Sequence, residues 1–223
     1  MLGVKSPLPG VVYPPEKVLE RYVTEGALGE VTLAEALMES LVKRPDKTAV
    51  SSPEGSITYA QLDHDSDCFA GALLDLGLEP LDRVVFQVVN SLEIVVALVA
   101  CWKADLIPVC TLAAHRDAEI TYLANHSGAK AHFIGIDERF DFVEFADQIA
   151  NRTPSMEHLV VVRGEGPAGL NTMAEMIANK DRAAARSAIA AIDRDPFQVT
   201  VFQLSGGTTS IPKMGFWGHP RLM

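Results

Sequence analysis

The chain has 223 residues, of which 48% are hydrophobic, and a formal net charge of −10 at pH 7. This length and apolar content allow a substantial core, as one large or two small domains. The acidic balance and the absence of any Lys/Arg run exclude a nucleic-acid-binding surface. The N-terminus lacks the pattern of a signal peptide, and the longest apolar run, residues 94–102, is too short to span a membrane. We therefore expect a soluble, cytoplasmic protein.

Helix and strand signals alternate along the chain. Two capping boxes, Thr32 with Glu35 and Thr58 with Gln61, each predict the start of a helix. Residues 92–103 are apolar nearly all round, which predicts a buried helix. The other expected elements are a hairpin over 48–51 and 56–58, strands over 83–89, 107–110, 131–134, 158–162 and 199–204, and helices over 118–126, 141–150 and 182–192. Strands separated by helices predict an α/β fold with a mainly parallel sheet and helices on both faces.

Two stretches without strong periodicity set the domain organisation. The residues that lead to Pro14 and Pro15 predict an arm on the surface, and the Gly-rich residues 163–171 predict a loop. Because the expected strands continue beyond that loop, we interpret it as an excursion within one domain. The chain is thus divided into an N-terminal arm, residues 1–30, and a single domain, residues 31–223.

Two polar clusters have both a structural and a functional interpretation. Residues 63–67, Asp-His-Asp-Ser-Asp, could suggest a metal site, but helical side chains at these positions do not converge, so we expect a solvated face. His115 and Arg116 could contact an acidic substrate, although we favour a role in capping the next helix. The three cysteines lie in apolar surroundings, which predicts reduced core thiols rather than disulfides or metal ligands. No catalytic triad is supported by the sequence.

The most informative segment, residues 204–213, reads Leu-Ser-Gly-Gly-Thr-Thr-Ser-Ile-Pro-Lys and follows the last expected strand. Gly206 and Gly207 permit a tight turn and a close approach of the backbone to a ligand. Hydroxyl groups, backbone N–H groups and the charge of Lys213 can together bind polyphosphate oxygens. The pattern differs from a Walker A loop, because its lysine lies between a proline and a methionine. On spacing alone, an ordinary Gly-Gly turn is the alternative.

This run resembles the phosphate loop of the acyl-adenylate-forming enzymes, which include acyl- and aryl-CoA synthetases, adenylation domains of peptide synthetases, and luciferase. The usual form is Thr-Ser-Gly-Thr-Thr-Gly-x-Pro-Lys-Gly. Ser210 replaces its second Gly, a change that costs about 1–3 kcal/mol if that Gly requires a positive φ. The resemblance implies that the following residues bind the phosphates of ATP: Ser205, Gly206, Gly207, Thr208, Thr209 and Lys213.

The likeness extends over nearly the whole chain. Residues 81–85, 89–93 and 97–104 are similar, in order, to the family segment with Asp-Arg-Val, Asn-Ser-x-Glu and Lys-Ala. Residues 114–122, the double glycine of the loop, and residues 12–30 resemble the branch that activates aryl acids such as 2,3-dihydroxybenzoate or salicylate. We therefore expect an aryl or cyclic carboxylic acid rather than a long fatty acid as the substrate.

The resemblance implies an acid–thiol ligase. A carboxylate attacks the α-phosphorus of ATP to give an acyl-adenylate and pyrophosphate, and the acyl group then passes to the thiol of CoA or of a carrier-protein phosphopantetheine. Donors around the β- and γ-phosphates would stabilise the leaving pyrophosphate. Mg²⁺ would bridge the phosphates, since it prefers oxygen ligands. The implied partners are a small carboxylic acid and an acyl carrier protein.

Family members continue well beyond the phosphate loop, with an acyl pocket, an adenine-binding motif and a C-terminal domain that carries the principal catalytic Lys. We therefore interpret residues 31–223 as the incomplete first part of the large N-terminal domain. By itself this chain should be inactive, bind ATP weakly and self-associate through uncovered apolar faces. The alternative is a truncated, non-catalytic remnant that acts at most as a binding or interaction module.

Overall fold

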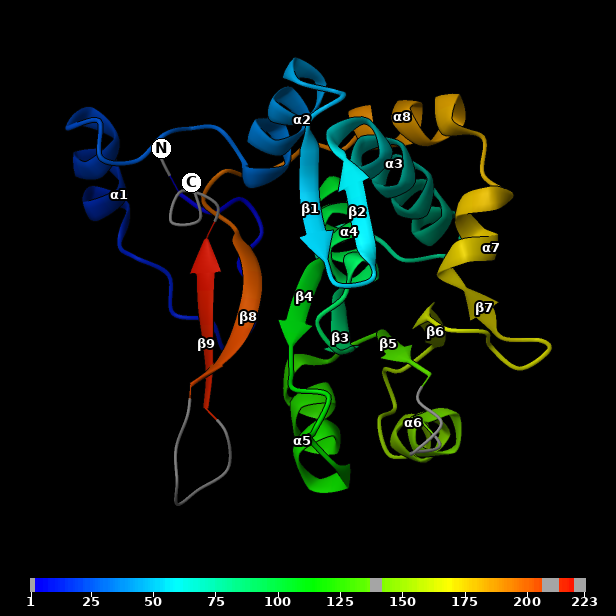
Figure 1. Ribbon diagram of the computed structural model, residues 1–223. Helices are drawn as coiled ribbons and strands as arrows, with labels where there is room; N and C mark the ends of the chain where they lie inside the picture. Colours follow the sequence, from blue (N-terminus) through cyan, green and yellow to red (C-terminus); the bar gives the residue numbers. More distant parts are fainter. Residues whose placement is uncertain (1–2, 137–141, 206–212, 219–223) are drawn as a thin grey trace.

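The computed structural model describes residues 3–136, 142–205 and 213–218 (Figure 1). A two-stranded sheet pairs β1 with β2, and a seven-stranded sheet has the order β7-β6-β5-β3-β4-β8-β9. The elements of the described chain are α1 (Glu16–Thr24), α2 (Leu33–Lys43), β1 (Thr48–Ser52), β2 (Gly55–Thr58), α3 (Tyr59–Asp75), β3 (Arg83–Gln87), α4 (Leu92–Lys103), β4 (Ile107–Cys110), α5 (Asp117–Ser127), β5 (Ala131–Gly135), α6 (Phe142–Asn151), β6 (His158–Arg163), β7 (Asn171–Thr172), α7 (Met173–Ala178), α8 (Arg182–Ala190), β8 (Val199–Ser205) and β9 (Lys213–Gly218).

The large sheet is parallel except at one end. β3 pairs in parallel with β4 on one side and β5 on the other, and β5–β6, β6–β7 and β4–β8 are parallel as well. Among the strand pairs described in this large sheet, only β8–β9 is antiparallel. The carboxyl ends of six strands therefore lie at one edge of the sheet, and the predicted mainly parallel sheet is confirmed.

Alternation along β3 divides the core between the two faces of the sheet. Val84 and Phe86 belong to a cluster with residues of α2, α3, α4, α7 and α8. Val85 belongs to a second cluster with residues of α5 and α6. In Figure 1, α5 and α6 lie below the sheet, while α2, α3 and α8 lie above it. Helices thus cover both faces, as predicted, because each side of a buried parallel strand needs apolar cover.

Four elements were not predicted, namely α1, β7, α7 and β9. α1 begins at Glu16, directly after its N-cap residue Pro15 and within the stretch expected to be a surface arm. α7 follows the expected loop and is capped by Thr172, whose hydroxyl accepts from the Glu175 N–H at 3.2 Å. That Thr-x-x-Glu spacing was a readable helix signal. β9 contains two glycines and has little strand character of its own, so its formation depends on pairing with β8.

Both predicted capping boxes are present, at the starts of α2 and α3. All three cysteines are free, with Cys68 and Cys101 buried and Cys110 half-buried. Across the described residues, none of the helices combines the length and apolar character that a membrane span requires.

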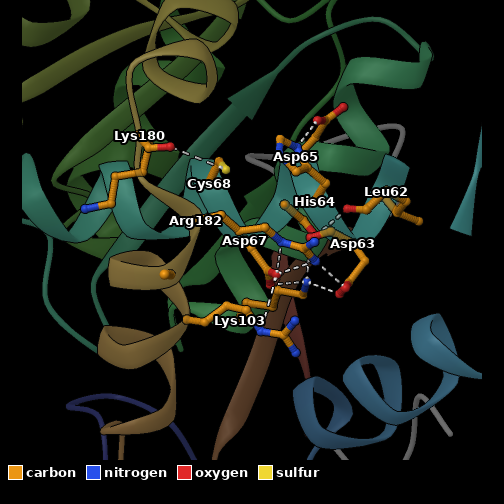
Figure 2. Close-up of polar contacts among 12 residues, drawn as sticks. Leu62, Asp63, His64, Asp65, Asp67, Cys68, Lys103, Lys180 and Arg182 are labelled. Atoms are coloured by element: carbon orange, nitrogen blue, oxygen red, sulfur yellow. Dashed lines mark hydrogen bonds and ion pairs between the residues drawn. The ribbon is translucent and has the colours of Figure 1, made fainter. Parts of the chain in front are cut away.

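A buried network of ion pairs joins α3, α4 and α8 (Figure 2). Lys103, the fully buried last residue of α4, donates to Asp63 Oδ1 at 2.8 Å and to Asp67 Oδ1 at 2.6 Å. Arg182, the first residue of α8, donates from Nε to Asp67 Oδ2 at 2.9 Å and from Nη2 to Asp63 Oδ2 at 2.5 Å. Two carboxylates therefore lie between two cations, which compensates the desolvation of all four charges.

The expectation of a solvated face over residues 63–67 is wrong for three of these residues. Asp63, Ser66 and Asp67 are only 7%, 0% and 3% exposed. His64 is exposed, and its ring nitrogen lies 2.9 Å from Asp65. The i,i+4 spacing places both aspartates on the side of α3 that meets α4 and α8. The sequence did contain a signal for their burial, namely Lys103 at the end of an apolar helix. A buried ammonium group requires carboxylate partners. In the described part of the chain, no three His, Cys, Asp or Glu side chains are grouped to hold a metal ion.

The close approach of α8 to α3 depends on small residues. A Cβ at Gly71 would lie 2.5 Å from the Cβ of Ala185, well inside van der Waals contact. Glycine on α3 and alanine on α8 therefore let the two helices come near enough for Arg182 to reach the aspartates.

We expect Lys103→Met to lower the free energy of unfolding by roughly 3–5 kcal/mol, because it leaves two buried carboxylates without their buried partner. Urea unfolding followed by circular dichroism measures the change. Lys43→Met is the matched control, since Lys43 pairs with Glu39 on the surface of α2 and its side chain is 61% exposed. That control should cost at most about 1 kcal/mol. Equal stabilities of the two variants would contradict the role assigned to Lys103.

The turn after α4 holds a buried carboxyl group. Asp105 has a φ of 57°, in the left-handed region that Asp tolerates better than most residues, and is 8% exposed. Burial raises its pKa from 3.8 to about 6, against the opposing effect of the Arg194 guanidinium. The folded protein therefore holds this proton more tightly than the unfolded chain does. Stability that the neutral carboxyl contributes at pH 4 is lost as the pH rises to about 6.

Asp105→Asn should raise the free energy of unfolding by on the order of 2–3 kcal/mol at pH 8 and leave it nearly unchanged at pH 4. Asparagine retains the left-handed conformation and removes only the charge. Denaturant unfolding of variant and parent across this pH range measures the difference. The exposed Asp46, changed to Asn, is the control and should follow the parent curve. A difference in unfolding free energy between variant and parent that is the same at every pH would contradict the buried-carboxyl interpretation.

Candidate functional site

The candidate site is the turn between β8 and β9, at the carboxyl edge of the sheet. β8 continues the parallel sheet next to β4, with Phe202 opposite Val109. β9 returns antiparallel, and Ser205 and Lys213 form the backbone pair next to the turn. The end of β8 and the start of β9 therefore lie where open α/β sheets bind ligands, outside the carboxyl ends of their strands.

The structure brings together the two ends of the predicted phosphate loop. Ser205 ends β8 and Lys213 begins β9, and the two face each other across the hairpin. Four predicted site residues lie outside the described residues: Gly206, Gly207, Thr208 and Thr209. Phosphate binding by the six residues remains a prediction.

The chain reverses its direction of winding beside this hairpin. β4 and β5, the next two strands along the chain, pair with opposite sides of β3. The order of the strands therefore reverses beside β3, which makes this position a topological switch point. Ser91 caps α4 at this position, and its hydroxyl accepts from the Ile94 N–H at 3.3 Å. The positive end of the α4 dipole thus lies at the same edge of the sheet as the candidate turn.

The segment after β4 folds back on itself at the start of α5. His115 Nδ1 accepts from the Leu112 N–H at 3.2 Å, so the neutral ring carries its proton on Nε2. Arg116 is the N-cap residue of α5, and its backbone N–H donates to Glu119 Oε2 at 3.1 Å. The preferred interpretation of the pair as caps of the next helix is confirmed for Arg116, the N-cap residue of α5. In the described chain, the hydrogen bonds of His115 go to the segment before the helix, to Gln87 and to the Arg116 side chain, so a capping role for His115 stays a prediction. Contact with an acidic substrate stays untested.

A buried polar pair beneath this segment was missed in the sequence. Gln87, the last residue of β3, donates from Nε2 to the His115 carbonyl at 2.9 Å. Its Oε1 lies 3.0 Å from Nε2 of His132 on β5. His132 is 1% exposed, and burial lowers its pKa to about 4, so the ring is neutral and Nε2 donates. Both ends of the Gln87 amide are thereby used, and the segment after β4 is tied to the sheet.

Known proteins resemble this chain over nearly all of its length. Triostin synthetase I of Streptomyces triostinicus is 36% identical over 209 residues, which are 93% of this chain and 37% of that protein. A salicylyl-CoA synthase / salicylate adenylyltransferase of a Streptomyces species is 34% identical over 211 residues, which are 92% of this chain and 37% of that protein. The apo structure of MbtA from Mycobacterium smegmatis superimposes with a TM-score of 0.82 at 28% identity, covering 95% of this chain and 38% of that one.

The chain thus spans 37% of the length of each of these two curated relatives. A family model described as AMP-binding enzyme matches residues 37–222, a range that includes the sheet and the candidate turn. The fold, the motif order and the family match agree with the resemblance inferred from the sequence. The chain belongs to the AMP-binding enzyme family.

Proposed function

We propose that this chain is the first part of an ATP-dependent ligase that activates a carboxylic acid as an acyl-adenylate. The observation that carries the proposal is the Ser-Gly-Gly-Thr-Thr-x-x-Pro-Lys turn at the carboxyl edge of the sheet in a member of the AMP-binding enzyme family. A hydroxyl- and glycine-rich turn followed by a lysine suits a polyphosphate better than an uncharged ligand.

In the proposed reaction a carboxylate oxygen attacks the α-phosphorus of ATP, and the bond from that phosphorus to the bridging oxygen breaks. Pyrophosphate carries away the developing negative charge. Hydroxyl and N–H donors of residues 205–209 would bind its oxygens, and Lys213 would neutralise part of its charge. The backbone pairing of Ser205 with Lys213 supports this role, because it fixes the two ends of the segment before ATP binds and so reduces the reorganisation needed.

Mg²⁺ would accompany ATP and bridge its phosphate oxygens, as a hard cation does. We assign no described residue to it. The acceptor in the second step would be a thiol, either of CoA or of the phosphopantetheine of a carrier protein. As the acid we propose a small aryl or cyclic carboxylic acid, because one of the most similar relatives is named for salicylate.

The deciding experiment measures acid-dependent exchange of labelled pyrophosphate into ATP by the full-length protein. We expect exchange with salicylate and 2,3-dihydroxybenzoate to exceed exchange with long-chain fatty acids. Activity with long-chain acids alone would contradict the aryl class and leave adenylation intact. No exchange with aryl, short-chain or long-chain acids would contradict adenylation itself and favour a non-catalytic remnant.

The same assay tests the turn. Thr208→Ala and Lys213→Ala should each lower kcat/KM for ATP by roughly 10²-fold, as expected for the loss of one donor to a developing charge. Ser187→Ala is the control, because Ser187 is exposed on α8 and lies outside the β8–β9 hairpin. An unchanged kcat/KM for ATP in both turn variants would show that adenylation does not depend on this turn.

Residues 1–223 alone should bind Mg·ATP with a dissociation constant well above the micromolar range. The chain spans about a third of its relatives, and phosphate contacts that are exposed to water and salt contribute little by themselves. We also expect self-association, since Val12, Tyr22 and Trp217 are 82%, 37% and 40% exposed. Calorimetry with Mg·ATP and light scattering measure the two properties. A monodisperse monomer with micromolar affinity would contradict both expectations.

A further inference from the structure

The N-terminal segment lies along the strand pair that carries the candidate turn (Figure 1). The backbone N–H of Lys5 donates to Asp195 Oδ2 at 2.6 Å, and its ammonium lies 2.8 Å from Asp193 Oδ1. Asp195 is 7% exposed, and its Oδ1 accepts from the Phe197 N–H at 2.9 Å. One carboxylate therefore shapes the turn that leads into β8 and also holds the N-terminal segment.

A second attachment centres on Gln198, which is 1% exposed and immediately precedes β8. Its Nε2 donates to the Ser6 carbonyl at 2.8 Å, and its Oε1 accepts from the Tyr13 hydroxyl at 2.5 Å. The same hydroxyl accepts from the Leu8 N–H at 3.1 Å. Burial raises the pKa of Tyr13, which keeps the phenol protonated as a donor. The Gln198 Oε1 also accepts from the Val199 N–H of β8 at 2.8 Å. The buried amide is thus satisfied by the N-terminal segment and by the first residue of β8, as a buried polar group must be.

The segment also makes apolar contacts with both strands of the hairpin. Leu8, Val11 and Tyr13 pack against the core cluster that includes Val199 and Phe202 of β8. The ring of Tyr13 lies 6.2 Å from that of Phe216 on β9, measured between centroids. Tyr13 consequently contacts β9 through its ring and the residue before β8 through its hydroxyl.

Beyond these contacts the segment is loosely enclosed. Hollows of about 500 Å³ and 590 Å³ lie along residues 8–15, and both are also lined by Met214 and Phe216 of β9. Val12, between the attachments, is 82% exposed. The hydrogen bonds of Tyr13 and Gln198 are therefore more important for holding the segment than they would be in a close-packed interior.

We propose that residues 3–13, here called the strap, position the candidate phosphate turn by holding β9 against β8, with Tyr13 and Gln198 as positioning residues. β9 is the edge strand of the described sheet and has a strand neighbour on one side only. A contact that bridges β8 and β9 limits how far their paired ends, Ser205 and Lys213, can separate. The strap precedes residue 37, where the family match begins. Its catalytic consequence rests on the proposed function.

Amide hydrogen exchange, followed by mass spectrometry on the 223-residue chain, tests the strap without ATP. Tyr13→Phe removes the bridging hydroxyl and retains the ring. Gln198→Ala removes the partner together with the acceptor of the Val199 N–H, so Val199 itself is left out of the comparison. Each change should speed exchange in β8 and β9 by roughly five- to tenfold and leave β5 and β6 at the parent rate. Tyr22→Phe is the matched control and should change nothing, since the Tyr22 hydroxyl has no hydrogen bond among the described residues and the residue is 37% exposed.

The double variant distinguishes a shared contact from two separate ones. Because Tyr13 and Gln198 share one hydrogen bond, their combined effect on exchange should fall short of the product of the single effects. Unchanged exchange in β8 and β9, equal acceleration in all strands, or fully multiplicative effects would each overturn the proposal.

In the full-length protein, Tyr13→Phe should raise the KM for ATP in pyrophosphate exchange several-fold while kcat changes less, and Tyr22→Phe should match the parent. An unchanged KM for ATP would overturn the positioning role. Absence of exchange in the parent itself would contradict the proposed function, whereas the hydrogen-exchange result would still decide whether the strap holds the hairpin.

Discussion

The buried ammonium of Lys103 is the constraint on which the arrangement of the helices depends. A charge in an apolar core is stable only beside opposite charges, so α3 must present Asp63 and Asp67 to the end of α4. Arg182 then compensates the second negative charge and draws in α8. The neighbouring residue, Trp102, donates from Nε1 to the Thr200 carbonyl of β8 at 3.0 Å. The end of α4 thus connects the helical layer to the strand that leads into the candidate turn.

That strand is held from several independent directions. β4 pairs with it in parallel, Trp102 contacts it from the helical face, and the strap is attached just before it through Asp195 and Gln198. Phosphoryl chemistry that proceeds through positioning and charge neutralisation needs donors that do not move as charge develops. Contacts that converge on β8 suit this requirement, because they fix the strand that leads into Ser205.

Local signals predicted most of the helices and strands. The capping boxes at Thr32 and Thr58 form as expected, because each depends on residues three positions apart. The phosphate-loop motif pointed to the edge where the hairpin lies. The solvated-face prediction failed at Asp63 and Asp67 because their partners, Lys103 and Arg182, are distant in sequence. Gln87 and His132 were missed for the same reason, since they lie on different strands that meet only in the sheet.

The sequence by itself therefore determined the alternation of elements, the parallel character of the sheet, the family and the residues of the candidate turn. These properties follow from periodicity, capping and an ordered motif, all of which are local. Tertiary structure alone decided which polar groups are buried together, that β9 pairs with β8, and that an N-terminal segment with little periodicity bridges this hairpin. Such contacts join residues up to about 190 positions apart, as between Lys5 and Asp195, and their stability comes from shared burial rather than from local preference.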